Sequence, residues 1–369
     1  MFEDLKGFTL TGACRCCAAP SADAVRRQFL ASGLGALALG VGGLATTADA
    51  AQGPRRRAGT PAVRTRLIDV HHHYFPQAHR DAAKRFAPNG PNAPEWSARR
   101  SLDEMDRAGI QTALLSLQIP GVWMGGAQES RRIARICNDE GAQLVADNPG
   151  RFGLFASIPV PDTEGSLAEI VYGLDVLKAN GIALISSYDG KYLGDPAFDS
   201  VLAELNRRRT VCFVHPTVAA CCEAVIPGVS ANTIEYATDT TRTIASLLFS
   251  GAAAKYPDIR FIFAHSGGTF PFLTGRFMRA AGKRAQDMPD WPLPLARRFY
   301  YEVAQGNTPG QLAALMKLVG VPQVLYGTDF PFRPAAEATE GLKTYPFTPA
   351  QLRAVQRDNA LALLPRLRG

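Results

Sequence analysis

Beyond residue 50, this sequence lacks the cysteine spacings that build structural metal sites. Its 369 residues include seven cysteines, of which three lie at 14–17, and no two of the remaining four form the C-x-x-C pair of a structural zinc knuckle. Cys137 falls in an apolar helical pattern and Cys212 in a predicted strand, so both are expected to be small buried side chains. The adjacent Cys221 and Cys222 leave two interpretations open, a redox-active pair or an ordinary loop.

A long apolar run and a strong excess of one charge are missing too. The most apolar stretch, at 30–45, is short and rich in glycine, so no permanent membrane span is expected. The net charge is +7, but the basic residues are spread along predicted helix faces, with one tight cluster at 55–57. No interleaved basic and aromatic pattern accompanies it, so we expect no nucleic-acid partner. A hydrophobic content of 46% with 20% charged residues excludes a mostly disordered chain.

Residues 1–50 have the layout of a twin-arginine signal peptide. Arg26 and Arg27 precede the glycine-rich apolar stretch, and an A-x-A cleavage pattern follows at 48–50. We predict recognition by the twin-arginine export machinery, cleavage before Ala51, and a mature protein that is periplasmic or secreted. The alternative interpretation is an uncleaved membrane anchor.

The rest of the chain is predicted to be a linker at 51–65 and one domain at 66–369. Short apolar runs predict eight buried strands, at 67–70, 112–117, 152–158, 182–185, 211–214, 260–264, 299–303 and 323–326. Amphipathic stretches predict helices at 101–108, opened by a capping box at Ser101, and at 128–147, 164–179, 198–208, 235–254, 309–319 and 349–364. This alternation favours an α/β fold of the (β/α)8 TIM-barrel type. A doubly wound sheet is the rival, but no G-x-G-x-x-G motif follows the first strand.

Four of the six histidines fall at the ends of predicted strands. His71 and His73 follow the first strand, His215 the fifth and His265 the sixth, and this end of a barrel is its catalytic face. Because side chains two apart on a strand share a side, His71 and His73 are expected to face inward together. His72 then points away and is interpreted as structural. A lone histidine at a strand end is usually a packed core residue, but four of them are hard to explain that way.

Asp329 follows the last predicted strand and adds a carboxylate to this group. Imidazole and carboxylate ligands suit one divalent ion, zinc first and manganese as the alternative. Three histidines and Asp329 would hold the ion and leave a position open for water or substrate. His265 would then be free to act as an acid or a base near neutral pH.

Taken together, the motifs resemble those of the amidohydrolase-related group that contains aminocarboxymuconate-semialdehyde decarboxylase. They are I-D-V-H-H-H at 68–73, V-H-P-T at 214–217, H-S-G-G at 265–268 and Y-G-T-D-F-P at 326–331, and the resemblance covers nearly all of the mature chain. It implies that His71, His73, His215 and Asp329 bind one metal and that His265 is catalytic. The resemblance alone also suggests a homodimer.

One stretch narrows the resemblance further. Residues 181–196, with P-G-V-W at 120–123, are similar to the 6-methylsalicylate decarboxylase branch. The fourth strand is followed by Ser186 and not by the lysine that bridges two metals in other amidohydrolases, so one ion is expected. The arginine that binds the muconate substrate lacks a clear counterpart near Met105, which argues against the muconate semialdehyde as substrate.

Two enzymatic functions remain open from the sequence. The first is a metal-dependent, non-oxidative decarboxylase of a small hydroxy-aromatic or unsaturated carboxylic acid, with Asp329 or His265 delivering the proton. Trp123 and Phe330 could stack on a planar ring, although each such residue is more often plain packing. The alternative is a hydrolase of a lactone, ester or amide that uses a metal-activated water. A third, non-enzymatic interpretation is an exported metal-binding protein, which would not need His265.

Overall fold

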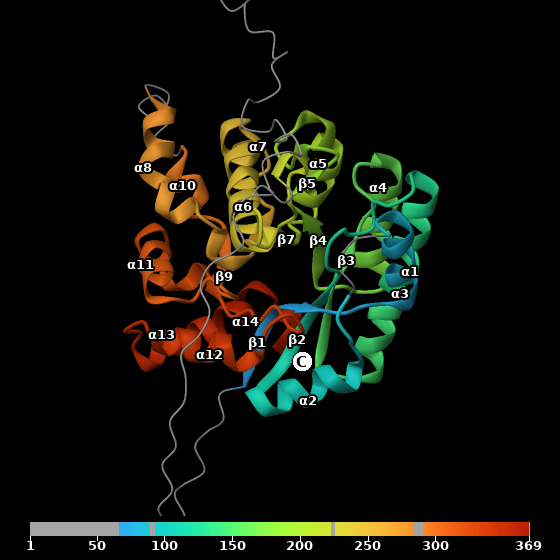
Figure 1. Cartoon of the computed structure of the whole chain (residues 1–369), viewed down its shortest axis with the longest axis horizontal. Coiled ribbons are helices and arrows are strands. Elements are labelled where there is room, and N and C mark those ends of the chain that lie inside the picture. Colours follow the sequence, from blue (N-terminus) through green and yellow to red (C-terminus); the bar gives the residue numbers. More distant parts are fainter. Residues whose placement is uncertain (1–65, 89–92, 223–225, 283–290, 369) are drawn as a thin grey trace, which may run out of the picture. The chain divides into compact units, whose positions relative to one another are not determined.

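Eight parallel strands form the centre of the computed structural model, which describes residues 66–88, 93–222, 226–282 and 291–368 (Figure 1). In sheet order they are β1 (Leu67–His73), β2 (Ile110–Ser116), β3 (Phe152–Ser157), β4 (Gly181–Ile185), β7 (Val211–His215), β8 (Arg260–Phe263), β9 (Tyr300–Glu302) and β10 (Val324–Leu325). The first and last strands also meet, because the N–H of Val70 donates to the carbonyl of Tyr326 at 3.0 Å. The predicted barrel is confirmed, while the signal peptide and linker predicted at 1–65 lie outside the described residues.

Helices follow the strands and surround them (Figure 1). They are α1 (Gln77–Phe86), α2 (Ala98–Ala108), α3 (Ala127–Asp147), α4 (Thr163–Val171), α5 (Asp199–Arg207), α6 (Ala231–Phe249), α7 (Ala252–Lys255), α8 (Phe270–Ala281), α10 (Leu293–Ala296), α11 (Pro309–Leu318), α12 (Ala335–Lys343), α13 (Pro349–Arg353) and α14 (Asn359–Leu363). A short antiparallel hairpin, β5 (Ser187–Tyr188) with β6 (Lys191–Tyr192), follows β4.

The predicted start of α2 is wrong. The helix begins at Ala98, and the side chain of Ser97 caps it by accepting a hydrogen bond from the N–H of Arg100. Ser101 is buried inside the helix, where its hydroxyl lies 3.0 Å from His72 Nε2 and 2.9 Å from Trp96 Nε1. The S-x-x-E pattern therefore marks a side chain that contacts the sheet, and not a helix end. The helix predicted at 235–254 is also divided, because Gly251 adopts a left-handed backbone between α6 and α7.

A β-bulge in β1 decides which of its side chains enter the barrel. Ile68 and Val70 belong to the apolar cluster formed by inward-facing strand residues. Strict alternation would continue with His72, but the register with β2 shifts between Asp69 and His72. The extra residue reverses the alternation, because a bulge re-aims the side chains that follow it. His71 and His73 therefore face inward, as predicted, and His72 faces outward.

Two apolar layers hold the barrel together. The smaller fills its interior with strand residues such as Leu114, Phe155 and Phe213, and is continued by Ala360 and Leu363 of α14. The larger lies between the strands and the surrounding helices and includes the predicted buried cysteines, Cys137 and Cys212. Since apolar side chains occupy the interior below, the strands' carboxyl ends are left for polar side chains.

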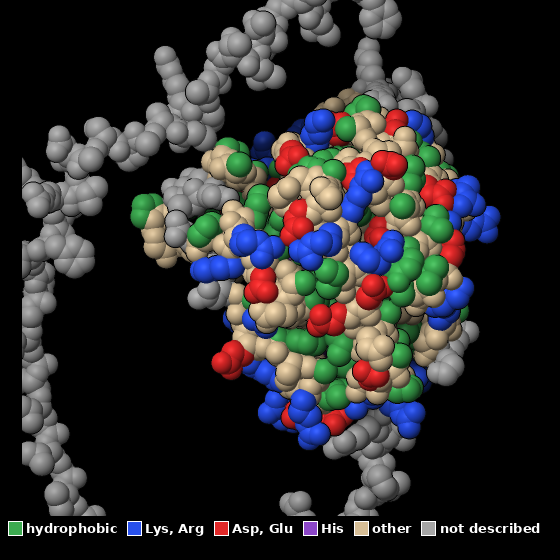
Figure 2. Space-filling model, turned by 90° about the vertical axis from the view of Figure 1, so that its right-hand side faces the viewer, with side chains coloured by type: hydrophobic (Ala, Val, Ile, Leu, Met, Phe, Trp, Pro, Cys, Tyr) green, Lys and Arg blue, Asp and Glu red, His purple; other side chains and the backbone are tan. Residues whose placement is uncertain are grey.

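The face over α1, α3 and α4 carries both signs of charge. Figure 2 shows Lys and Arg side chains there interspersed with Asp and Glu and with hydrophobic groups. Arg131, for example, lies 2.8 Å from Glu164, and Arg135 lies 2.8 Å from Glu169. This face therefore offers no single-sign surface for a nucleic acid. In the part of the chain that the structure describes, no helix combines the length and the apolar character needed to cross a membrane.

Candidate metal centre

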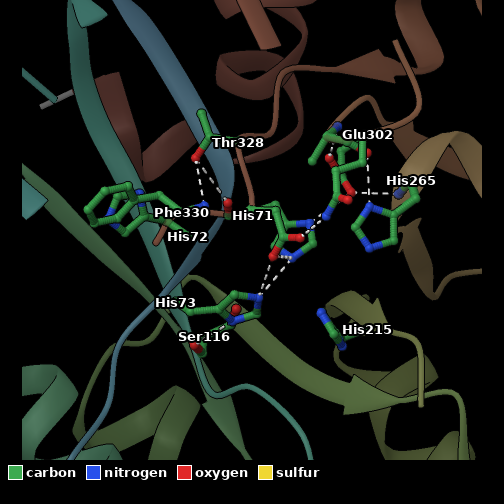
Figure 3. A network of polar contacts seen from close by, with 12 residues as sticks. His71, His72, His73, Ser116, His215, His265, Glu302, Thr328 and Phe330 are labelled. Carbon is green, nitrogen blue, oxygen red and sulfur yellow. Dashed lines mark hydrogen bonds and ion pairs between the residues drawn. The ribbon is translucent and has the colours of Figure 1, made fainter. Parts of the chain in front are cut away.

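Five sequence-predicted residues meet at the carboxyl ends of four strands and the turns that follow them. His71 and His73 come from β1, His215 ends β7, and His265 and Asp329 lie in the turns after β8 and β10. Their side chains point toward a common centre, as His71, His73, His215 and His265 show in Figure 3. All five are buried, and His265 is the most exposed of them at 9%.

The four predicted ligands are close enough to share one ion. The Nε2 atoms of His71 and His73 lie 3.0 Å apart, and Asp329 Oδ1 is 3.2 Å from the first and 3.0 Å from the second. One ligand atom from each of His71, His73, His215 and Asp329 lies within 4.8 Å of all the others. Three imidazole nitrogens and one carboxylate oxygen form a ligand set that zinc and similar divalent ions use.

Hydrogen bonds on the far side of each ring determine which nitrogen faces the centre. The Nδ1 atoms of His73, His215 and His265 face the backbone carbonyls of Ser116, Pro216 and Ala304, at 3.2, 2.7 and 2.9 Å, and His71 Nδ1 faces Glu302 at 2.9 Å. A carbonyl or carboxylate oxygen only accepts, so each Nδ1 carries the donated hydrogen. In the neutral rings Nε2 then has its lone pair directed inward. Lone pairs held this way, with an acceptor behind each ring, fit a bound cation.

Burial and charge set the protonation of these groups in the metal-free protein. Burial alone would favour the neutral acid of Asp329, but His71 and His73 outweigh it and hold the carboxyl pKa well below its usual value. Burial also opposes a charge on His71, yet the carboxylates of Glu302 and Asp329 raise its pKa to about 10. For His73 and His215 burial dominates and lowers the pKa, so both rings are neutral at pH 7 and able to bind an ion.

Glu302 is a site residue that the sequence interpretation missed. It is fully buried in β9 and, besides facing His71, accepts hydrogen bonds from the backbone N–H groups of His265 and Ala304, at 2.7 and 2.6 Å. It therefore connects the ring of His71 on β1 with the backbone of the turn that carries His265. A charged residue inside the apolar run at 299–303 was the available indication, because a carboxylate in a buried strand needs partners.

His265 combines two unusual features. Its Nε2 is buried and has no hydrogen-bond partner among the described residues. Its backbone is left-handed, with φ 55°, as are those of Gln305 and Asp329, with φ 51° and 60°. Such conformations cost of order 1–3 kcal/mol in residues other than glycine, and they concentrate where function requires them. The unpartnered nitrogen is thus available to a ligand or to a proton.

Two residues predicted to contact substrate, Phe330 and Trp123, have partners of their own in the structure. Phe330 is 5% exposed and stacks on His72, with ring centroids 4.9 Å apart, on the outer side of β1 (Figure 3). The proposed stacking of Phe330 on a substrate is therefore wrong, and its role is packing. Trp123 is partly buried and donates from Nε1 to Asp189 Oδ2 at 3.0 Å, which links it to the β5–β6 hairpin. The structural role expected for His72 is confirmed by its contacts with Asp69 and Ser101, each at 3.0 Å.

Aromatic side chains that were not singled out border the cluster. Phe332 is 41% exposed and packs its ring against His73, with centroids 5.6 Å apart. Tyr236 of α6 packs against His215, with ring centroids 5.9 Å apart.

At the end of β4, the hydroxyl of Ser186 forms hydrogen bonds with Thr217 and Asp239, and Lys191 is exposed in the β5–β6 hairpin. No lysine therefore bridges a second ion at this strand end.

A barrel with histidine and aspartate ligands at its strand ends is the architecture of metal-dependent hydrolases and related lyases. This chain belongs to the amidohydrolase family, whose model matches residues 68–366. It is 36% identical to decarboxylase yanB of Aspergillus niger, over 81% of this chain and 87% of that protein. It is 33% identical to 6-methylsalicylic acid decarboxylase of Penicillium expansum, over 82% and 97%. The resemblance to that decarboxylase branch is confirmed.

Solved structures share the same fold. A crystal structure described as an amidohydrolase II has 29% identity and a TM-score of 0.75, covering 81% of this chain and 99% of its own. A dihydroxybenzoic acid decarboxylase from Polaromonas, solved with bound manganese and 2-nitroresorcinol, has 22% identity and a TM-score of 0.71, covering 82% and 98%. At that identity the second likeness supports the fold alone.

Proposed function

We propose that the protein is a metal-dependent decarboxylase that removes CO2 from a small hydroxy-aromatic carboxylic acid. The observation that carries the proposal is the unpartnered, buried Nε2 of His265 beside the four-ligand cluster. The decarboxylases among its relatives, including one named for 6-methylsalicylic acid, support the reaction class.

The site residues would have two roles in the reaction, metal binding and proton transfer. His71, His73, His215 and Asp329 would hold the ion, which when bound draws electron density from the substrate's carboxylate and neighbouring oxygen. As the bond to the carboxyl carbon breaks, its electron pair stays on the ring carbon and CO2 leaves. A proton must then reach that carbon, and His265 Nε2 or the carboxyl of Asp329 would deliver it after taking it up from water or from the substrate. The reaction is not an oxidation, so its electron balance requires no redox partner.

The nature of the ion is part of the proposal. Three imidazole nitrogens and one carboxylate oxygen suit zinc, and manganese is the alternative. One ion per chain is proposed because no lysine follows β4, where Ser186 stands.

Export through the twin-arginine machinery to the periplasm or beyond, and assembly as a homodimer, are proposed from the sequence and the resemblance only.

A substrate panel tests the function. The purified protein, loaded with zinc or manganese, is incubated with 2-hydroxybenzoates, including the 6-methyl compound, and with aryl lactones and esters. Release of CO2 from a hydroxybenzoate supports the proposal. Ring opening or ester cleavage without CO2 release would support the alternative hydrolase, and full metal loading without turnover of any compound would support a binding protein.

A further inference from the structure

The two carboxylate oxygens of Asp329 have different partners. Oδ1 faces the histidines, 3.0 Å from His73 Nε2 and 3.2 Å from His71 Nε2. Oδ2 accepts a hydrogen bond from the side-chain amide of Gln305, which lies three residues beyond the end of β9. The carboxylate is therefore held from two sides, and only one of its oxygens points at the proposed ion site.

We propose that Gln305 is a positioning residue that keeps Asp329 a one-oxygen ligand and thereby favours zinc over ions that take more oxygen ligands. This inference rests on the metal site of the proposed function. An amide N–H on Oδ2 restrains rotation of the carboxylate and occupies the oxygen that would complete a two-oxygen contact. Zinc is commonly bound by four or five ligands. Larger and harder ions such as manganese prefer a higher number of oxygen ligands than zinc does.

The placement of Gln305 indicates a role at the site and not in stability. The residue is exposed, and the one hydrogen bond of its side chain within the described part of the chain goes to Asp329. Its backbone is left-handed at φ 51°, a conformation for which glutamine has no special tolerance. The turn is anchored on both sides of it, because the Ala304 carbonyl accepts from His265 Nδ1 and the Gly306 carbonyl from the Ser266 hydroxyl.

Two variants separate positioning from backbone effects. Gln305→Leu keeps the approximate size of the side chain and removes the donor. Gln305→Asn keeps an amide, but its side chain is one methylene shorter and cannot reach Asp329 in the same way. Because asparagine is enriched in left-handed conformations, this variant should be at least as stable as the wild type. If Gln305 only stabilises the backbone, Gln305→Asn should bind metal as the wild type does. If Gln305 positions Asp329, Gln305→Asn should bind metal more weakly.

The measurement is the affinity of the metal-stripped full chain for Zn²⁺, by competition with a chromophoric chelator, and for Mn²⁺, by electron paramagnetic resonance of the free ion. Loss of a residue that orients a ligand typically weakens metal binding about 10–100-fold. We expect a loss in that range for zinc in both variants, and a smaller loss for manganese, so that the zinc-to-manganese preference falls. The melting temperatures of the variants, recorded in parallel, should stay near that of the wild type, so that lower stability does not account for the weaker metal binding.

The matched control is Gln143→Leu. Gln143 donates to Asp147 Oδ1 at 2.7 Å, so it is also an exposed glutamine bonded to an aspartate, but it lies on α3. Its variant should bind both ions as the wild type does. Wild-type affinities and preference in both Gln305 variants would overturn the inference while leaving the metal site intact. Failure of the wild type to bind either ion would overturn the metal site itself, and the inference with it.

Discussion

Glu302 Oε1 lies 2.9 Å from His71 Nδ1 and accepts the backbone N–H of His265 at 2.7 Å. One buried carboxylate oxygen thus orients a proposed ligand and anchors the proposed acid–base residue. Glu302→Gln replaces one carboxylate oxygen, which only accepts hydrogen bonds, with an NH2 group, which donates them. The partners of Glu302 are N–H groups, which need an acceptor. We expect metal affinity to fall about 10–100-fold, as for other residues that orient ligands.

Chelator competition measures that loss, and Glu169→Gln is the control. Glu169 is also a buried glutamate, but its partners are Arg135 and Asn138, which do not belong to the metal cluster. Its variant should be less stable and yet bind the ion normally. Equal losses of affinity in both variants would mean that metal binding merely follows stability.

His265 is expected to act on the substrate and not on the ion. In His265→Asn the left-handed backbone is well tolerated, because asparagine is enriched there. Metal content and melting temperature should remain near normal while kcat falls about 10²–10⁴-fold, the usual contribution of a general acid or base. Loss of the metal would instead make His265 a ligand, and an unchanged kcat would remove it from the chemistry.

Substitutions of the adjacent residues His71 and His72 should have opposite effects on metal binding. His71→Ala removes a ligand and should lose most of the metal. His72→Ala should keep the metal, but it removes the partner of Asp69 and Ser101 and should reduce the free energy of unfolding by about 1–3 kcal/mol. Elemental analysis and thermal unfolding of the two variants test this pair. Full metal occupancy in the His71 variant, or two ions in the wild type, would contradict the assignment.

His79 should make the protein sensitive to acid. It is 3% exposed, and burial lowers its pKa from 6.5 to about 4 in the folded protein. Between these values the unfolded chain binds a proton that the folded chain does not, so stability is lost as the pH falls from 6.5 toward 4. A shift of that size corresponds to about 3 kcal/mol.

His79→Gln isolates this effect, because glutamine does not titrate and can still donate to the Gly121 carbonyl that lies 2.8 Å from His79 Nε2. The drop in unfolding free energy between pH 7 and pH 4 should be about 3 kcal/mol smaller in the variant. Denaturant unfolding at both values checks it, and parallel pH profiles for the two proteins would contradict it.

Export has its own test. Replacing Arg26 and Arg27 by lysine should abolish passage to the periplasm if the twin-arginine machinery carries the protein. Cell fractionation with detection of the mature chain, expected to begin at Ala51, measures it. An unchanged periplasmic yield would indicate a different route.

The barrel and the convergence of five site residues were predictable because strand ends in a parallel barrel meet on one face. Other contacts depend on geometry that sequence patterns do not carry. The sequence did not indicate the bulge in β1 that lets Val70 and His71 both face inward, or the stacking of Phe330 on His72 that keeps Phe330 away from the site. Glu302 acts through a strand of only three residues, and Gln305 through a left-handed turn, so neither has a periodic signature.

Deuterium incorporation tests the central claim most directly. A hydroxybenzoate that the protein converts is supplied in D2O to the metal-stripped, the zinc-loaded and the manganese-loaded protein, and the product is observed by NMR. We expect one deuterium at the carbon that carried the carboxylate, with turnover absent after metal removal and restored by adding back an ion. Turnover that persists without metal, or a product that retains its carboxylate, would contradict the assignment as a metal-dependent decarboxylase.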